Sequence, residues 1–220
     1  ILAKRLALAK EALMVRYELL KDATSDISPI HWQHGGLARL EKHEPILPLL
    51  HDGYATITLG YIGMYEMTKL MTGKSHTEEK EFSLEVMRRM KQATLDWKKE
   101  TGLGFALYGT PAESLCHRFA KIDLARFGNI KDVTDKGYYT NSYHVDVREK
   151  IDAFEKLKFE SEFQKISSGG AISYIEIPNM QHNVPALEAA VKFIYDNIQY
   201  AEFNTKSDYC HCCGFDGEII

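Results

Sequence analysis

The segment Tyr108-Gly-Thr-Pro-Ala-Glu-Ser114 holds the residues best suited to chemistry. Gly109 allows the backbone to turn sharply out of a strand, Thr110 suits the cap of a following helix, and Pro111 suits its first turn. Amide groups at such a helix start, with the positive end of the helix dipole, favour phosphate binding. Glu113 is expected in the first turn, facing the same opening. The segment therefore predicts a phosphate site beside one carboxylate.

Glu113 also has a structural interpretation. Thr110-x-x-Glu113 matches the capping box, in which the glutamate hydrogen-bonds the backbone of the cap residue, and the pattern alone favours this reading. A carboxylate repels phosphate at close range. If both roles are functional, the amides should face the phosphates and Glu113 should face the sugar.

The cysteines suggest metal chemistry at the end of the chain. Cys210-x-x-Cys213 has the ligand spacing of zinc sites, and Gly214 permits a tight turn that points two thiolates at one ion. A tetrahedral site needs four ligands, so this pair supplies half. Cys212 or His211 could serve as a further, improvised ligand, although His211 is expected to be solvated. Cys116 stands alone on an expected helix and is interpreted as a small buried thiol.

Strands and helices that alternate along the chain must position these residues. Such alternation predicts an α/β architecture with a largely buried sheet, either open or closed into a barrel. Ligands in such folds bind beyond the carboxyl ends of the strands, here after Tyr108 and Ile177. Expected strands cover 54–58, 105–108 and 171–177. Expected helices begin near Leu2, Met64, Ser75 and Pro111, and a fifth contains Leu187–Ile198. The fourth helix is expected to have Leu115, Phe119 and Ile122 on its inner face.

Composition excludes several classes of function. The chain has 220 residues, is 45% hydrophobic and carries a formal net charge of -4. Its 27 basic and 31 acidic residues are scattered, so no basic stripe exists to bind a nucleic acid polymer. No apolar run is long enough for a membrane span, and no signal peptide opens the sequence. A cytoplasmic protein is expected.

Five motifs together resemble a known family. They resemble, in this order, the anaerobic (class III) ribonucleoside-triphosphate reductases, which are glycyl-radical enzymes. Their order and their coverage of most of the chain make the resemblance specific. The motifs are Thr58-Leu-Gly-Tyr-Ile-Gly63, Tyr108-Gly-Thr-Pro-Ala-Glu-Ser114, Thr134-Asp-Lys-Gly-Tyr-Tyr-Thr-Asn-Ser-Tyr-His144, Gly169-Gly-Ala-Ile-Ser-Tyr174 and Asp208-Tyr-Cys-x-x-Cys-Gly214.

The resemblance implies a fold and a domain division. The chain is expected to be a fragment from the C-terminal half of such a reductase. Residues 1–206 would form the second half of the ten-stranded catalytic α/β barrel, and residues 207–220 the truncated start of a Cys-x-x-Cys zinc module. In the family a second Cys-x-x-Cys follows downstream and completes the zinc site.

The resemblance also implies a reaction. Family members replace the 2′-hydroxyl of a ribonucleoside triphosphate by hydrogen through a thiyl radical that abstracts the 3′-hydrogen, with formate as the usual reductant. Glu113 corresponds to the family's active-site glutamate, which suits deprotonation of the 3′-hydroxyl. Thr110, Pro111, Ala112 and Ser114 are expected to bind substrate, as is Asn141, which stands in a polar aromatic segment.

Two family residues lie outside these motifs. The thiyl cysteine is expected upstream and the radical glycine downstream, so the chain by itself should not turn over. The family implies a radical-generating activase that uses S-adenosylmethionine and an iron-sulfur cluster, and a homodimer. Two alternative functions are a hydrolase that uses Glu113 and Glu176 as a carboxylate pair, and a zinc-containing interaction module.

Overall fold

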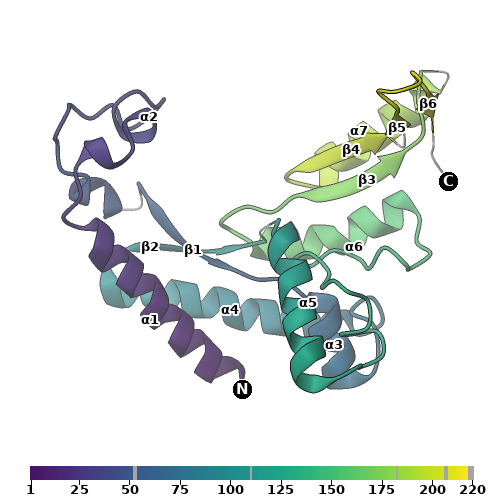
Figure 1. Cartoon of the computed structure of the whole chain (residues 1–220), viewed down its shortest axis with the longest axis horizontal. Coiled ribbons are helices and arrows are strands. Elements are labelled where there is room, and N and C mark those ends of the chain that lie inside the picture. The colour runs from purple at the N-terminus through teal and green to yellow at the C-terminus, as the bar shows by residue number, and fades with distance from the viewer. Residues whose placement is uncertain (52–53, 110, 182, 206–207, 218–220) are drawn as a thin grey trace. The chain divides into compact units, whose positions relative to one another are not determined.

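The computed structural model describes residues 1–51, 54–109, 111–181, 183–205 and 208–217 (Figure 1). The chain forms two compact units, one of Ile1–Gly60 with Val86–Tyr108, the other of Tyr61–Glu85 with Gly109–Ile220. The predicted boundary between residues 206 and 207 stays a prediction. Among the described helices, none combines the length and the apolar character needed to cross a membrane.

The first unit packs helices on a parallel strand pair. Strands β1 (Thr56–Gly60) and β2 (Gly104–Tyr108) pair with Ile57 opposite Phe105. Trp97 contacts the Phe105 ring edge-on at 5.5 Å and forms a core with Leu103. Apolar side chains of α1 cover this core. The other elements are α1 (Leu2–Leu20), η1 (Ser25–Ile27), α2 (Pro29–Trp32), η2 (Leu47–Leu50) and the part of α4 (Lys80–Thr101) from Val86 onward.

The second unit contains a second parallel pair. Strands β3 (Ser173–Ile177) and β4 (Ala201–Thr205) pair with Ile175 opposite Phe203, and α6 lies beside β3 (Figure 1). Ile175 forms a core with Leu157 and Ile198. The other elements are α3 (Met64–Thr72), α5 (Glu113–Phe127), α6 (Ala153–Ile166), α7 (Val184–Asn197), and the antiparallel strands β5 (Asp208–Tyr209) and β6 (Asp216–Gly217).

Local signals identified several boundaries correctly. The reciprocal hydrogen bonds of the predicted capping box form, since the Ser75 amide donates to Glu78 Oε2 at 2.8 Å and the Glu78 amide donates to Ser75 Oγ at 3.3 Å, but α4 begins only at Lys80. Gly102 follows α4 with φ of +74° and Gly128 follows α5 with φ of +78°, as their helix-ending roles require. The predicted strands at 54–58, 105–108 and 171–177 correspond to β1, β2 and β3.

Two elements and one helix face differ from the prediction. No helix was predicted at α6 and no strand at β4. The polar residues on the buried side of α6, including Glu160 and Gln164, hide its helical period. The predicted inner face of α5 was wrong: Phe119 and Ile122 are 39% and 51% exposed. Its small residues Cys116 and Ala120 are buried instead, which confirms the buried-thiol interpretation of Cys116.

His76 is a fully buried histidine in the second unit. Its Nε2 lies 3.0 Å from the carbonyl oxygen of Tyr143, and the rings of Tyr65, Phe159 and Phe163 surround it. Burial lowers the pKa of His76 to about 4. Between pH 6.5 and pH 4, His76 therefore binds a proton in the unfolded chain but stays neutral in the folded chain. Stability is lost as the pH falls through that window, by about 1.4 kcal/mol per pH unit.

We expect the free energy of unfolding of this chain to fall by about 2 kcal/mol more between pH 6.5 and pH 5 in the wild type than in His76→Gln. Glutamine keeps a donor for the Tyr143 carbonyl and does not titrate. Urea unfolding at the two pH values measures the difference, with the exposed His34→Gln as the control. An unchanged pH slope in His76→Gln would contradict this assignment.

Candidate functional site

The site begins where the chain leaves β2. The Gly109 amide donates to the carbonyl oxygen of Gly170 at 3.0 Å, and Gly109 pairs with Ala171 in a parallel bridge. A Cβ at Gly109 would lie 3.0 Å from Tyr143 Cε1, 3.2 Å from Ala171 Cβ and 3.3 Å from Tyr61 Oη. The φ of Gly109 is outside the left-handed region, so glycine is required here by close approach and not by a sharp turn.

Helix α5 starts later than predicted. Ala112 occupies the N-cap position without a side-chain cap, and Glu113 is the first helical residue. Pro111 therefore precedes the helix, so its predicted place in the first turn was wrong, as was the assignment of the cap to position 110. Thr110 itself lies outside the described residues, and so does the side chain of Glu113. Ser114 is exposed in the first turn.

Residues 139–142, here called the clamp segment, bind to two helices. On the α3 side, the Gly63 amide donates to the Thr140 carbonyl at 2.8 Å, and the Met64 amide donates to the Ser142 carbonyl at 3.1 Å. The clamp segment thereby supplies acceptors for amides at the start of α3, which have no partner within the helix.

The α5 side of the clamp segment is held equally closely. The Tyr139 amide donates to the Cys116 carbonyl at 3.1 Å, and the Tyr139 hydroxyl donates to Asp123 at 2.8 Å. Burial, with this hydrogen bond, raises the pKa of Tyr139, so the phenol stays protonated as the donor. Asn141 Oδ1 accepts the Ala112 amide at 3.0 Å. Asn141 therefore fixes the backbone that immediately precedes Glu113.

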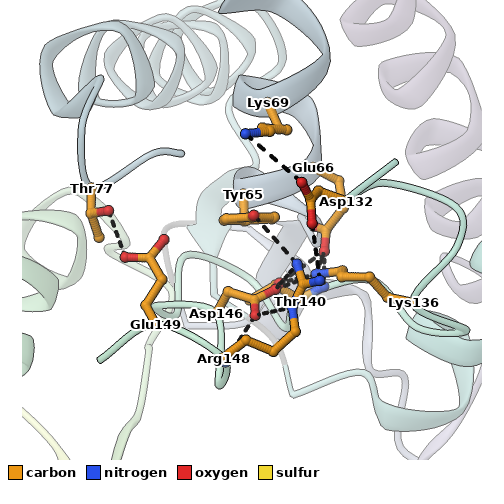
Figure 2. A network of polar contacts seen from close by, with 10 residues as sticks. All are labelled: Tyr65, Glu66, Lys69, Thr77, Asp132, Lys136, Thr140, Asp146, Arg148 and Glu149. Carbon is orange, nitrogen blue, oxygen red and sulfur yellow. Dashed lines mark hydrogen bonds and ion pairs between the residues drawn. The ribbon is translucent and has the colours of Figure 1, made fainter. Parts of the chain in front are cut away.

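A buried ion cluster lies behind the clamp segment (Figure 2). The Lys136 ammonium lies 2.5 Å from Glu66 Oε1 and also pairs with Asp146; the three side chains are 1%, 3% and 0% exposed. The ammonium also lies 4.4 Å from the Tyr65 ring centre and 4.5 Å from that of Tyr138. Lys136 thus neutralises two carboxylates that no longer contact water.

Hydrogen bonds keep Asp146 of this cluster ionised. Burial by itself raises the pKa of Asp146, but hydrogen bonds from Arg148 and Lys136 outweigh it and hold the pKa at about 2. Arg148 donates from Nε to Asp146 Oδ1 at 2.9 Å and from a terminal nitrogen to Asp132 at 3.1 Å. Glu66 Oε1 accepts both the amide and the hydroxyl of Thr140 at 2.8 Å. The cluster and the clamp segment therefore meet at Thr140.

Sequence reasoning did not single out Lys136, Glu66 or Asp146. Lys136 stands in a polar stretch before Gly137, where a lysine is ordinarily solvated, and Glu66 stands in a short helix. Their partners are distant along the chain, since Thr140 and Glu66 are 74 positions apart. A local pattern contains no signal for such pairing.

A cavity of about 360 Å³ lies beside β3 and β4. Glu176 and the neighbouring Asn204, which are opposite each other in the strand register, both line it. His144 also lines it, and its Nε2–H donates to the Ile172 carbonyl at 2.7 Å; burial lowers the pKa of His144. The cavity places Glu176 on a ligand-accessible wall of this unit.

The Cys210 and Cys213 pair lies in the hairpin of β5 and β6. The Cys210 amide donates to the Phe215 carbonyl, and the Gly214 amide donates to the Cys210 carbonyl, both at 2.8 Å. Gly214 has φ of +72°, as the predicted tight turn requires. Backbone hydrogen bonds from Cys213 and Cys212 lower the pKa of the Cys210 thiol. Within the described residues, no three His, Cys, Asp or Glu side chains are grouped to hold a metal ion.

Comparison with known proteins identifies the family. The profile of the anaerobic ribonucleoside-triphosphate reductases matches residues 1–220. The chain belongs to this family. Among curated reductases, that of Haemophilus influenzae is 43% identical over 99% of this chain, that of Escherichia coli is 41% identical over 100%, and that of phage T4 is 39% identical over 98%. The chain spans about a third of their length, namely 32%, 32% and 35%.

Solved anaerobic reductases have the same fold. The Thermotoga maritima enzyme with MES in its active site matches with a TM-score of 0.75 at 25% identity, over 98% of this chain and 35% of the reductase chain. The same enzyme in complex with dATP and CTP matches with a TM-score of 0.70 at 21% identity, over 98% and 34%. The predicted α/β fold class, as part of the barrel of these reductases, is confirmed.

Proposed function

We propose that the protein containing this chain reduces ribonucleoside triphosphates to deoxyribonucleoside triphosphates, and that the turn between β2 and α5 forms part of its active site. The observation that carries the proposal is the family match over residues 1–220, which includes the Thr-Pro-Ala-Glu motif of this turn. The contacts at Gly109 and Ala112 support it, because they fix that turn in the second unit. Rigid positioning is what a reacting carboxylate requires.

Glu113 is the proposed catalytic residue. Its carboxylate would accept the proton of the 3′-hydroxyl after the 3′-hydrogen has been removed, and transfer of that proton to the departing 2′-hydroxyl would let it leave as water. The 3′-hydrogen is removed by radical chemistry that residues outside this chain supply. The backbone of Glu113 opens α5, so the helix dipole stabilises the ionised carboxylate that acts as the base.

Residues beside Glu113 are proposed to hold the substrate. Thr110, Pro111 and Ser114 flank the start of α5 in the sequence, and helix amides at such a start favour phosphate groups. The Ala112 amide is engaged by Asn141 Oδ1, so these two residues contribute to binding through the shape of the turn and through the remaining donors of Asn141. The dATP and CTP complex of the Thermotoga maritima relative supports nucleotides as the ligand class.

The rest of the chemistry is proposed from the family. It comprises a glycyl radical generated by an activase with S-adenosylmethionine and an iron-sulfur cluster, formate as the reductant, a homodimer and a cytoplasmic location. Zinc is proposed at Cys210 and Cys213, because a tight turn and a lowered thiol pKa suit two thiolate ligands. The ion would stabilise the fold of this tail once a second cysteine pair completes the site.

The proposal is tested by anaerobic assay of the intact protein. With its activase, S-adenosylmethionine and formate, the intact chain is expected to form deoxynucleoside triphosphate from ribonucleoside triphosphate. The 220-residue chain under identical conditions is expected to form none, because the thiyl cysteine and the radical glycine of the family lie in other segments. Absence of product from activated, glycyl-radical-containing intact protein contradicts the proposed function.

A further inference from the structure

The environment of Lys136 connects a buried charge to the proposed catalytic turn. The connection has three contacts: Lys136 to Glu66, Glu66 to Thr140, and the neighbouring Asn141 to Ala112. Each contact is a hydrogen bond or ion pair between groups within the second unit (Figure 2 for the first two). Together they form a continuous path from a buried ammonium to the backbone beside Glu113.

We propose that Lys136 is a positioning residue for Glu113, acting through the clamp segment, and this inference rests on the proposed function. Glu66 Oε1 accepts the Lys136 ammonium together with the amide and hydroxyl of Thr140. As a carboxylate, Glu66 can hold this geometry only while its charge is compensated, since burial disfavours an uncompensated ion. Lys136 supplies that compensation.

Loss of the ammonium acts on the turn through geometry. Glu66 and Asp146 are both buried, and Arg148, whose side chain is 44% exposed, contacts only the second of them among the described contacts. Without Lys136, the Glu66 carboxylate is buried without its counter-ion and is drawn toward water, which weakens its two bonds to Thr140. Asn141 then shifts with Thr140, because the two residues are consecutive. The Ala112 amide loses its fixed acceptor, and the start of α5 is released.

Asn141 also acquires a structural role beside its proposed contact with substrate. Its Oδ1 receives the Ala112 amide at 3.0 Å and lies 3.9 Å from the Cys116 thiol, so this oxygen faces α5. Ser142, the next residue, adopts φ of +38°, a conformation that a serine rarely takes and that the contacts on both sides hold in place. The clamp segment therefore connects two helices and fixes the turn.

The experiment uses the intact reductase and compares Lys136→Met with Lys156→Met. Lys156 is a matched control, because it also neutralises a fully buried carboxylate, Glu160, at 2.8 Å but does not contact the clamp segment in any described interaction. Lys136→Met is expected to lower kcat about 10- to 100-fold with KM for the nucleotide changed less than about threefold. Lys156→Met is expected to keep kcat within about twofold of the wild type.

A double-mutant cycle separates positioning from loss of stability. In a background of Asn141→Ala, where the turn is already released, Lys136→Met should lower kcat by less than about twofold further. The effect of Lys136→Met on thermal stability should be the same in the wild-type and the Asn141→Ala backgrounds. Lys136→Met with Glu66→Gln should recover part of kcat, because a neutral amide oxygen at position 66 can accept from Thr140 without a compensating charge. Additive losses of kcat and no recovery overturn the proposal.

Hydrogen exchange tests the same inference independently of enzyme activity. In the intact protein, peptides that cover residues 112–116 should exchange faster in Lys136→Met than in the wild type, and at the wild-type rate in Lys156→Met. Unchanged exchange in Lys136→Met overturns the positioning role even if the enzyme is active. If the wild-type protein makes no deoxynucleotide, the proposed function is overturned. Faster exchange of residues 112–116 in Lys136→Met would still establish the link from Lys136 to the turn.

Discussion

Glu113→Gln in the intact reductase is expected to lower kcat by at least about 100-fold while nucleotide binding changes less than about threefold. Glutamine has nearly the same shape as glutamate and keeps the start of α5 intact, but it cannot accept the proton of the 3′-hydroxyl. The loss therefore falls on the chemical step. Anaerobic turnover with activated enzyme measures kcat, and equilibrium binding of the triphosphate measures affinity.

The control for this variant is Glu188→Gln, which removes one carboxylate from α7, away from the turn between β2 and α5 in sequence. It should leave turnover within about twofold of the wild type. The glycyl radical content of both variants must match that of the wild type, so that activation is excluded as the cause. Wild-type turnover by Glu113→Gln would show that this carboxylate serves the helix start only.

Gly109→Ala is expected to lower turnover about 10- to 100-fold, with a loss of about 1–3 kcal/mol in stability. The new methyl group would lie 3.0 Å from Tyr143 and 3.2 Å from the Cβ of Ala171, with Tyr61 Oη on a third side. Tyr143 cannot give way easily, because it is fully buried and donates from its hydroxyl to the Ile172 carbonyl at 2.8 Å. The turn must therefore move, and Glu113 moves with it.

Gly128→Ala is the matched control for the effect on stability. Gly128 has φ of +78°, so alanine there is strained by about 1 kcal/mol, but its Cβ meets no atom within 4 Å. Thermal unfolding should show that both variants are destabilised, whereas turnover should fall only in Gly109→Ala. Equal turnover in the two variants contradicts a requirement for close approach at Gly109.

Local patterns predicted much of the fold. The capping box at Ser75 and Glu78, the glycines after α4 and α5, and strands β1, β2 and β3 follow from the chemistry of short segments. Helix α6 was not predicted, because its buried face carries Glu160, Ser161 and Gln164 beside its apolar residues. Glu160 and Gln164 bind partners elsewhere in the chain: the Val145 amide donates to Glu160 Oε1, and Gln164 donates to the Tyr200 carbonyl.

The turn between β2 and α5 also combines features that the sequence predicts with contacts that only the folded structure creates. The sequence by itself determined the family, the α/β class and the position of the turn that carries Glu113, because ordered motifs and short-range conformational preferences are written in consecutive residues. Only the tertiary structure decided that Asn141 holds Ala112 and that Lys136 compensates Glu66 and Asp146. These contacts join residues far apart in the chain, and burial, which turns an ordinary lysine into a buried counter-ion, exists only after the segments have packed together.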